Sequence, residues 1–107
     1  MPIETLCIVQ SGQVSDAQRE TLESRLNQIA RDTFGEEAAA SWLVIEPGNG
    51  WTAAKPSTSA LVSMNVPPMD EPDRTQLLHN ICGAWSEETH CSLNEIVASA
   101  ITAPEGE

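Results

Sequence analysis

Pro2, which directly follows Met1, is the residue whose type and position most suggest chemistry. If Met1 is removed, Pro2 becomes a free secondary amine at the start of the chain. An α-amino group titrates at about pH 8 in model compounds, and partial burial lowers that pKa because it disfavours the charged form. Such an amine is suited to act as a general base at neutral pH. About one residue in twenty is proline in ordinary chains, so the Met-Pro pair needs support from elsewhere.

A second group of candidates lies in the loop of residues 46–59, which is rich in glycine and holds Trp51 and Lys55. Lys55 is the only lysine of the chain. We expect it to be the cation that approaches Pro2, because the loop leads into the strand expected beside the first strand. Trp51 is expected to form an apolar wall of the same site. An ordinary crossover loop with Trp51 packed on the core remains the alternative.

The overall charge limits the classes of partner. The chain has sixteen acidic and five basic residues, which gives a net charge of −11. Such a chain is not expected to bind nucleic acid or an anionic membrane surface, and a site for an anionic substrate has to gather its cations locally. No stretch approaches the ~20 apolar residues that span a bilayer, and the start lacks the basic and apolar regions of a signal peptide.

The remaining candidate ligands and nucleophiles predict no metal or cofactor site. The chain has three cysteines, Cys7, Cys82 and Cys91, without metal-ligand spacing, which indicates a reducing cytoplasm. Cys7 within a strand is expected to be a small buried side chain, with a reactive thiol as the alternative. His79 and His90 are expected on the surface. No phosphate-binding loop, dinucleotide fingerprint or nucleophile motif is present.

The apolar periodicity predicts two β-α-β units in one domain. The expected strands cover residues 3–9, 42–45, 58–66 and a stretch within 93–101, and the expected helices cover 15–34 and a segment that begins after Asp70. Ser15 and Gln18 form a capping-box pattern, and Gly35 is expected to end the first helix. The first unit occupies residues 1–46, the connecting loop 47–57 and the second unit 58–107, with a frayed tail from 103.

These elements predict an α+β fold, with a four-stranded mixed sheet and two helices on one face. The other face then needs a partner. The stretch from Leu6 to Val9 is apolar on both faces of its strand, which favours an oligomer that buries sheet against sheet. A ferredoxin-like domain with the same element order is the alternative fold.

Together, Pro2, the two units and the connecting loop resemble the tautomerase superfamily, which includes macrophage migration inhibitory factor. The closest likeness is to the subgroup of cis-3-chloroacrylic acid dehalogenase, in which a similar loop joins the halves. Here the loop is Pro47-Gly48-Asn49, then Trp51, then Ala53-Ala54-Lys55-Pro56-Ser57. The resemblance covers nearly the whole chain. It implies a homotrimer, removal of Met1 and a Pro2 pocket near a subunit boundary.

This chain also departs from the dehalogenase pattern. The family's helix histidine falls at about Ala30, and its two substrate-binding arginines fall near Ser63 and Pro67. Its tyrosine has no counterpart, because the chain contains none, and Glu105 and Glu107 are poor substitutes for its C-terminal glutamate. Without an arginine fork for a carboxylate and an acid that activates water, dehalogenation is not expected.

Two functions follow from the resemblance. In the first, Pro2 is the base of a keto–enol isomerisation of a small 2-oxo or 2-hydroxy acid, with Lys55 and backbone N–H groups stabilising the enolate. In the second, the protein is a non-catalytic trimeric homologue that has lost the substrate-binding arginines.

Overall fold

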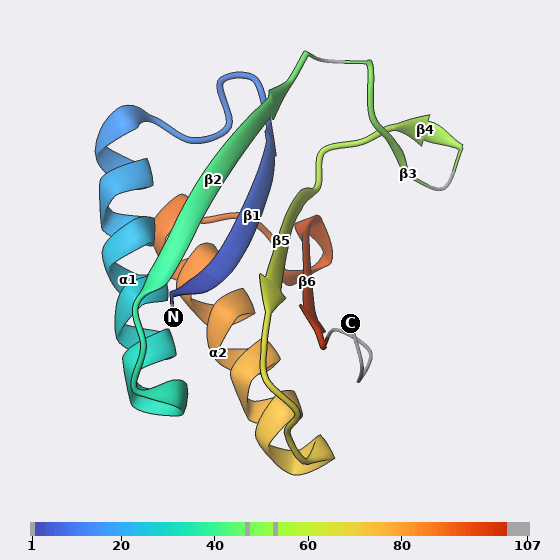
Figure 1. Ribbon diagram of the computed structural model, residues 1–107. Helices are drawn as coiled ribbons and strands as arrows, with labels where there is room; N and C mark the ends of the chain where they lie inside the picture. The colour runs from blue at the N-terminus through green and yellow to red at the C-terminus, as the bar shows by residue number, and fades with distance from the viewer. Residues whose placement is uncertain (1, 47, 53, 103–107) are drawn as a thin grey trace.

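The computed structural model of the chain describes residues 2–46, 48–52 and 54–102 (Figure 1). Met1, Pro47, Ala53 and the tail 103–107 lie outside the described residues. The expectations of Met1 removal and of a frayed tail concern residues in this part of the chain.

The described elements form one four-stranded mixed sheet in the order β2-β1-β5-β6. The strands are β1 (Ile3–Gln10), β2 (Ala38–Ile45), β5 (Ala60–Asn65) and β6 (Ile96–Ile101). β1 pairs in parallel with β2, β5 pairs in parallel with β6, and β1 and β5 are antiparallel at the centre. The two strands of each β-α-β unit are therefore direct neighbours. This excludes the split β-α-β arrangement of the ferredoxin-like alternative.

Both helices form where the sequence predicts them. Helix α1 (Asp16–Phe34) begins with the capping box: Ser15 Oγ accepts from the Gln18 N–H at 3.2 Å, and the Gln18 side chain accepts from the Ser15 N–H at 2.9 Å. It ends at Gly35, which has a left-handed φ of 71°. Helix α2 (Glu71–Thr89) begins after Asp70, but the Asp70 side chain makes no capping hydrogen bond.

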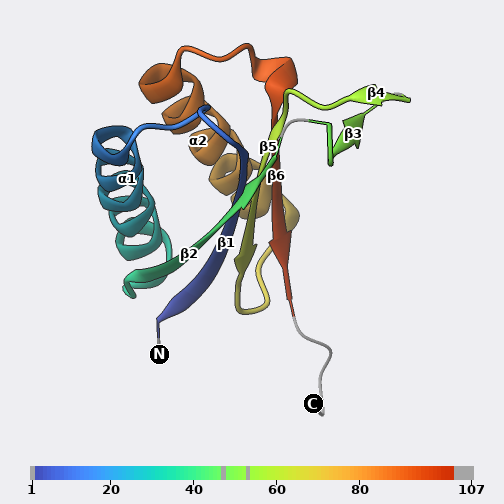
Figure 2. The same cartoon turned by 90° about the horizontal axis from the view of Figure 1, so that it is seen from above.

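The core lies between the helices and one face of the sheet, as Figure 2 shows from above. The stripe predicted for α1 is buried at Leu22, Leu26 and Ala30, but Ile29 is only partly buried and Thr33 is exposed. The stripe predicted for α2 is buried except at Leu78, which is partly buried. The Trp85 ring lies 5.7 Å from that of Trp42 and is the largest fully buried side chain of the described residues. The buried residues of the two helices are Leu22, Leu26, Ala30, Leu77, Ile81, Ala84 and Trp85.

No described helix covers the second face of the sheet (Figure 2). Alternation along the strands places Leu6, Leu43, Val97 and Ile101 on this open face, and they are 41%, 52%, 49% and 52% exposed. The prediction of two helices on one face and an uncovered apolar face on the other is therefore confirmed for the described residues.

Several elements differ from the sequence-based expectation. β5 spans Ala60–Asn65 rather than 58–66. β2 begins at Ala38 rather than Trp42, because its alanines pair with the start of β1 from Ile3 onward. A 3-10 turn, Leu93–Glu95, precedes β6. The central loop contains a small two-stranded ribbon, β3 (Trp51–Thr52) and β4 (Lys55–Pro56), which projects away from the sheet in Figure 1. Neither helix is long and apolar enough to cross a membrane within the residues described.

Candidate functional site

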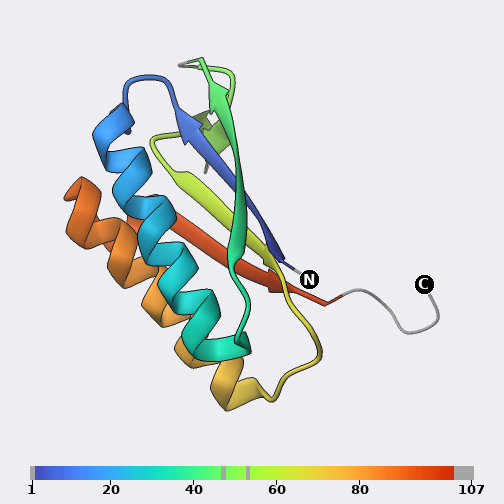
Figure 3. The ribbon, with the colours of Figure 1, turned by 60° about the vertical axis from the view of Figure 1, so that its left-hand side comes forward.

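The amino end of β1 lies where four strand ends meet. The Ile3 N–H donates to the Glu37 carbonyl at 2.7 Å, which fixes the start of β1 beside the start of β2. Because β5 runs antiparallel to β1, β5 and β6 end at this same edge, at Asn65 and Ile101 (Figure 3). Pro2 is exposed immediately before Ile3.

A hollow of about 430 Å³ opens on the uncovered face at this end of the sheet. Its lining combines the apolar side chains of Leu6 and Ile101 with polar groups of neighbouring strands. The hydroxyl of one of these, Ser63, accepts a hydrogen bond from Ser99 at 3.1 Å. Glu4 is the charged residue among those that line it; the others with polar side chains are Thr5, Ser41, Ser63 and Asn65.

Pro2 and Glu4 belong to the same row of the strand. Ile3, Thr5, Cys7 and Val9 are the buried residues of β1, so Glu4 and Leu6 face the open side, and the alternation places Pro2 with them. Residues two apart in a strand are separated by about 6–7 Å. Pro2 therefore lies on the side of the sheet on which the hollow opens.

Lys55 belongs to β4, and the ribbon of β3 and β4 lies at the other end of the sheet from the start of β1 (Figure 1). The ribbon that carries Lys55 leads into Ala60, the first residue of β5. The next residue, Leu61, pairs with Ile8 near the carboxyl end of β1, so the ribbon lies at that end of the sheet. From Ile3 to Gln10 the strand rises by about 23 Å, at roughly 3.3 Å per residue. The expectation that Lys55 approaches Pro2 of the same chain is wrong, because β5 is indeed the neighbour of β1 but runs antiparallel to it.

Trp51 lies on the same ribbon and is 63% exposed. Its indole N–H donates to the Gly48 carbonyl at 2.9 Å. The alternative in which Trp51 packs on the core is therefore wrong as well. Within one chain, the structure brings neither Trp51 nor Lys55 to Pro2.

Arg31 is the basic residue that the structure places near the start of β1, and the sequence analysis missed it. It lies in the last turn of α1, and its guanidinium pairs with the Glu37 carboxylate, while the Glu37 carbonyl holds the Ile3 N–H. Both side chains of the pair are more than half exposed. The sequence did contain a signal for Arg31. It lies at the end of the first expected helix, just before the second strand. Because the first two strands were expected to be parallel neighbours, the start of the second strand was expected beside the start of the first.

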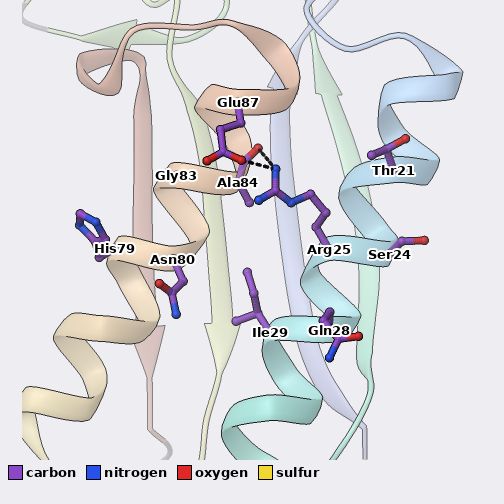
Figure 4. Close-up of a pocket in the computed structure, with 10 residues that line it drawn as sticks. All are labelled: Thr21, Ser24, Arg25, Gln28, Ile29, His79, Asn80, Gly83, Ala84 and Glu87. Atoms are coloured by element: carbon purple, nitrogen blue, oxygen red, sulfur yellow. Dashed lines mark hydrogen bonds and ion pairs between the residues drawn. The ribbon is translucent and has the colours of Figure 1, made fainter.

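A larger groove of about 520 Å³ runs between the helices on the far side of the sheet (Figure 4). Arg25 in its lining is paired with Glu87 at 2.9 Å and also donates to the Ala84 carbonyl at 3.4 Å. His79 lines the groove and is exposed, as expected. The groove lies away from the sheet edge that follows Pro2, whereas the smaller hollow opens at that edge and includes Glu4, so the hollow is the better candidate despite its size.

The cysteines of the described chain are free, and the predicted role of Cys7 is confirmed. Cys7 is 0% exposed, and burial raises its thiol pKa to about 12. Burial, and secondarily the proximity of Cys91, also raise the pKa of Cys82. A thiol with a raised pKa forms little thiolate at neutral pH, so a Cys7 nucleophile is excluded. Among the residues described, no group of acidic, histidine and cysteine side chains could hold a metal ion.

Comparison with solved structures identifies the fold. The chain is similar to Ps01740, with 21% identity, 95% of each chain covered and a TM-score of 0.89. It is similar to N1, a member of the cis-3-chloroacrylic acid dehalogenase family, with 11% identity, coverage of 94% of this chain and 75% of N1, and a TM-score of 0.87. A fused 4-OT that forms a symmetric trimer matches with 13% identity, coverage of 97% and 88%, and a TM-score of 0.86.

The chain thus has the fold of the tautomerase and macrophage migration inhibitory factor structures, which confirms the fold that the sequence resemblance implies. At such low identities the likeness establishes the fold and nothing finer. No family model matches the chain, and no curated protein sequence matches it.

Proposed function

We propose that the protein is a tautomerase in which Pro2, freed by removal of Met1, is the general base of a keto–enol isomerisation. The substrate class is a small 2-oxo or 2-hydroxy acid. The observation that carries the proposal is the place of Pro2: exposed at the end of a rigid strand, in one row with Glu4, on the side of the sheet on which a hollow with polar and apolar walls opens. The three free cysteines support a cytoplasmic location.

The chemistry requires a base next to the carbon that loses its proton. A free Pro2 amine takes a proton from the carbon beside the carbonyl, and the protonated amine returns a proton to that carbon in the reverse direction. No metal or cofactor is needed for this exchange. The Leu6 and Ile101 side chains provide an apolar wall for the body of a substrate such as phenylpyruvate.

A substrate carboxylate requires a cation, and the lining of the hollow contains no lysine or arginine among the residues described. Two basic residues are candidates for this cation. Arg31 of the same chain lies near the start of β1, although Glu37 competes for its guanidinium. Lys55 and Trp51 can serve the site only from a neighbouring subunit, whose ribbon would extend to the Pro2 edge. We propose the second candidate, since the ribbon projects beyond its own sheet (Figure 1). The ribbon also carries Trp51, an exposed aromatic side chain of the kind enriched at interfaces.

We expect a homotrimer in solution. Outside the hollow, the open sheet face exposes Leu43 and Val97, which is costly in water, and a fused 4-OT of similar fold forms a symmetric trimer. Light scattering at micromolar protein should give three times the mass of one chain. A stable monomer with the native circular dichroism spectrum would contradict this expectation.

Lys55→Ala should lower the rate on the order of 100-fold if Lys55 stabilises developing negative charge. Because the expected contact is between subunits, trimers assembled from Lys55→Ala and Pro2→Ala chains should contain sites with both native residues. Mixed trimers should therefore regain a measurable part of the activity that neither variant has alone. Failure of the mixture to exceed its parents, once mixing is verified by mass, would exclude Lys55 from the neighbouring site.

The alternative is a non-catalytic trimer with the same scaffold. It is favoured by one observation: Ser63, where the family resemblance places an arginine, lines the hollow as a hydrogen-bonded hydroxyl. Intact-mass measurement of the amino end separates the two, because a retained Met1 converts the Pro2 nitrogen into an amide that cannot act as a base.

A further inference from the structure

Glu4 is a charged group in the hollow that the proposed mechanism leaves unused. Its side chain is exposed on the open face, and no hydrogen bond or ion pair engages its carboxylate among the residues described. On one side its neighbour in β2 is Ala39, a small residue. On the other side, continuing the register that pairs Thr5 with Met64 brings Asn65 opposite Glu4. The carboxylate thus has free space above a neutral surface.

Keto–enol isomerisation moves two protons, one at carbon and one at oxygen. Pro2 accounts for the proton at carbon, so the proton at oxygen needs a second group. The serine, threonine and asparagine side chains of the lining do not exchange protons readily at neutral pH. Glu37, the other carboxylate near the start of β1, is occupied by Arg31. Among the described residues, Glu4 is therefore the remaining candidate for the group that exchanges the proton at oxygen.

We propose that Glu4 is the second proton carrier of the site and takes the hydroxyl proton of the enol. The role rests on the proposed function of Pro2. In ketonisation, the Glu4 carboxylate accepts the proton from the enol oxygen as the carbon–oxygen double bond forms. The electrons of the carbon–carbon double bond then take a proton from the protonated Pro2 amine. The product is the ketone, with a neutral amine and a protonated Glu4.

The distance between Glu4 and Pro2 also allows the proton to be returned, so that the catalytic cycle can be repeated. The protonated Glu4 returns its proton to the Pro2 amine, directly or through one water molecule, since residues two apart in a strand are about 6–7 Å apart. The starting charges are restored without any net gain or loss of protons.

The test compares processed protein with Glu4→Gln, which keeps the size and polarity of the side chain but cannot accept the proton. With the enol of phenylpyruvate as the probe, kcat should fall about 100-fold, while KM stays within about twofold of the wild type. Glu20→Gln is the matched control: Glu20 is exposed on α1, which covers the other face of the sheet, and its variant should have wild-type kinetics.

Glu4→Ala allows a second measurement, which distinguishes a proton-transfer role of Glu4 from a purely structural one. It leaves a gap that a small carboxylate can enter, so added formate should restore part of the lost rate in a concentration-dependent manner. A wild-type kcat in Glu4→Gln, or no rescue of Glu4→Ala by formate, would exclude the role of Glu4 and leave that of Pro2 intact. No ketonisation by processed wild type would instead refute the proposed function, and the role of Glu4 with it.

Discussion

Processed protein that begins at Pro2 should interconvert the enol and keto forms of phenylpyruvate about 100 to 10,000 times faster than its Pro2→Ala variant. General acid–base catalysis by one positioned group contributes a factor of this size. Pro2→Ala keeps an amine at the chain start but changes its basicity, its shape and its secondary character. The measurement is the rate of enol absorbance loss, on protein whose amino end has been verified by intact mass.

The control for Pro2 is the same chain with Met1 retained. Its Pro2 nitrogen is part of a peptide bond, so this protein should be as slow as Pro2→Ala while keeping the same fold and assembly. If the retained-Met1 protein and Pro2→Ala both turn over substrate at the rate of the processed wild type, the proline mechanism is wrong. The non-catalytic scaffold would then be the better account of the chain.

Leu22→Ala should lower the free energy of unfolding by about 2–5 kcal/mol. Leu22 lies on the buried face of α1, is 0% exposed and packs between the helix and the sheet, so its loss leaves a cavity in the core. Leu93→Ala is the matched control: Leu93 is 65% exposed, and the same truncation there should cost within about 0.5 kcal/mol.

The measurement is urea unfolding at a fixed protein concentration, because association of subunits also contributes to apparent stability. Equal midpoints for Leu22→Ala and Leu93→Ala would contradict the described core. Such a result would mean that the face of α1 that carries Leu22 does not lie in the packed interior.

The local elements of this protein were predictable from its sequence. The Ser15–Gln18 capping box and Gly35 mark the ends of α1, because the groups that satisfy a helix end lie within a few residues of it. The buried stripes of α1 and α2 follow from the helical period, and two β-α-β units imply parallel strand pairs. These are short-range rules, so they determine the number and order of the main elements and the side of each that faces the core.

The candidate site depended on long-range pairing, which no local rule determines. Lys55 precedes a strand that does lie beside β1, but the antiparallel direction of β5 places Lys55 at the opposite end of the sheet from Pro2. The same pairing brings Ser63 and Asn65 beside Glu4, and the Ile3–Glu37 hydrogen bond brings Arg31 to the start of β1. The sequence alone determined that Pro2 directly precedes a strand. The strand directions, set by tertiary packing, decided which side chains lie near it.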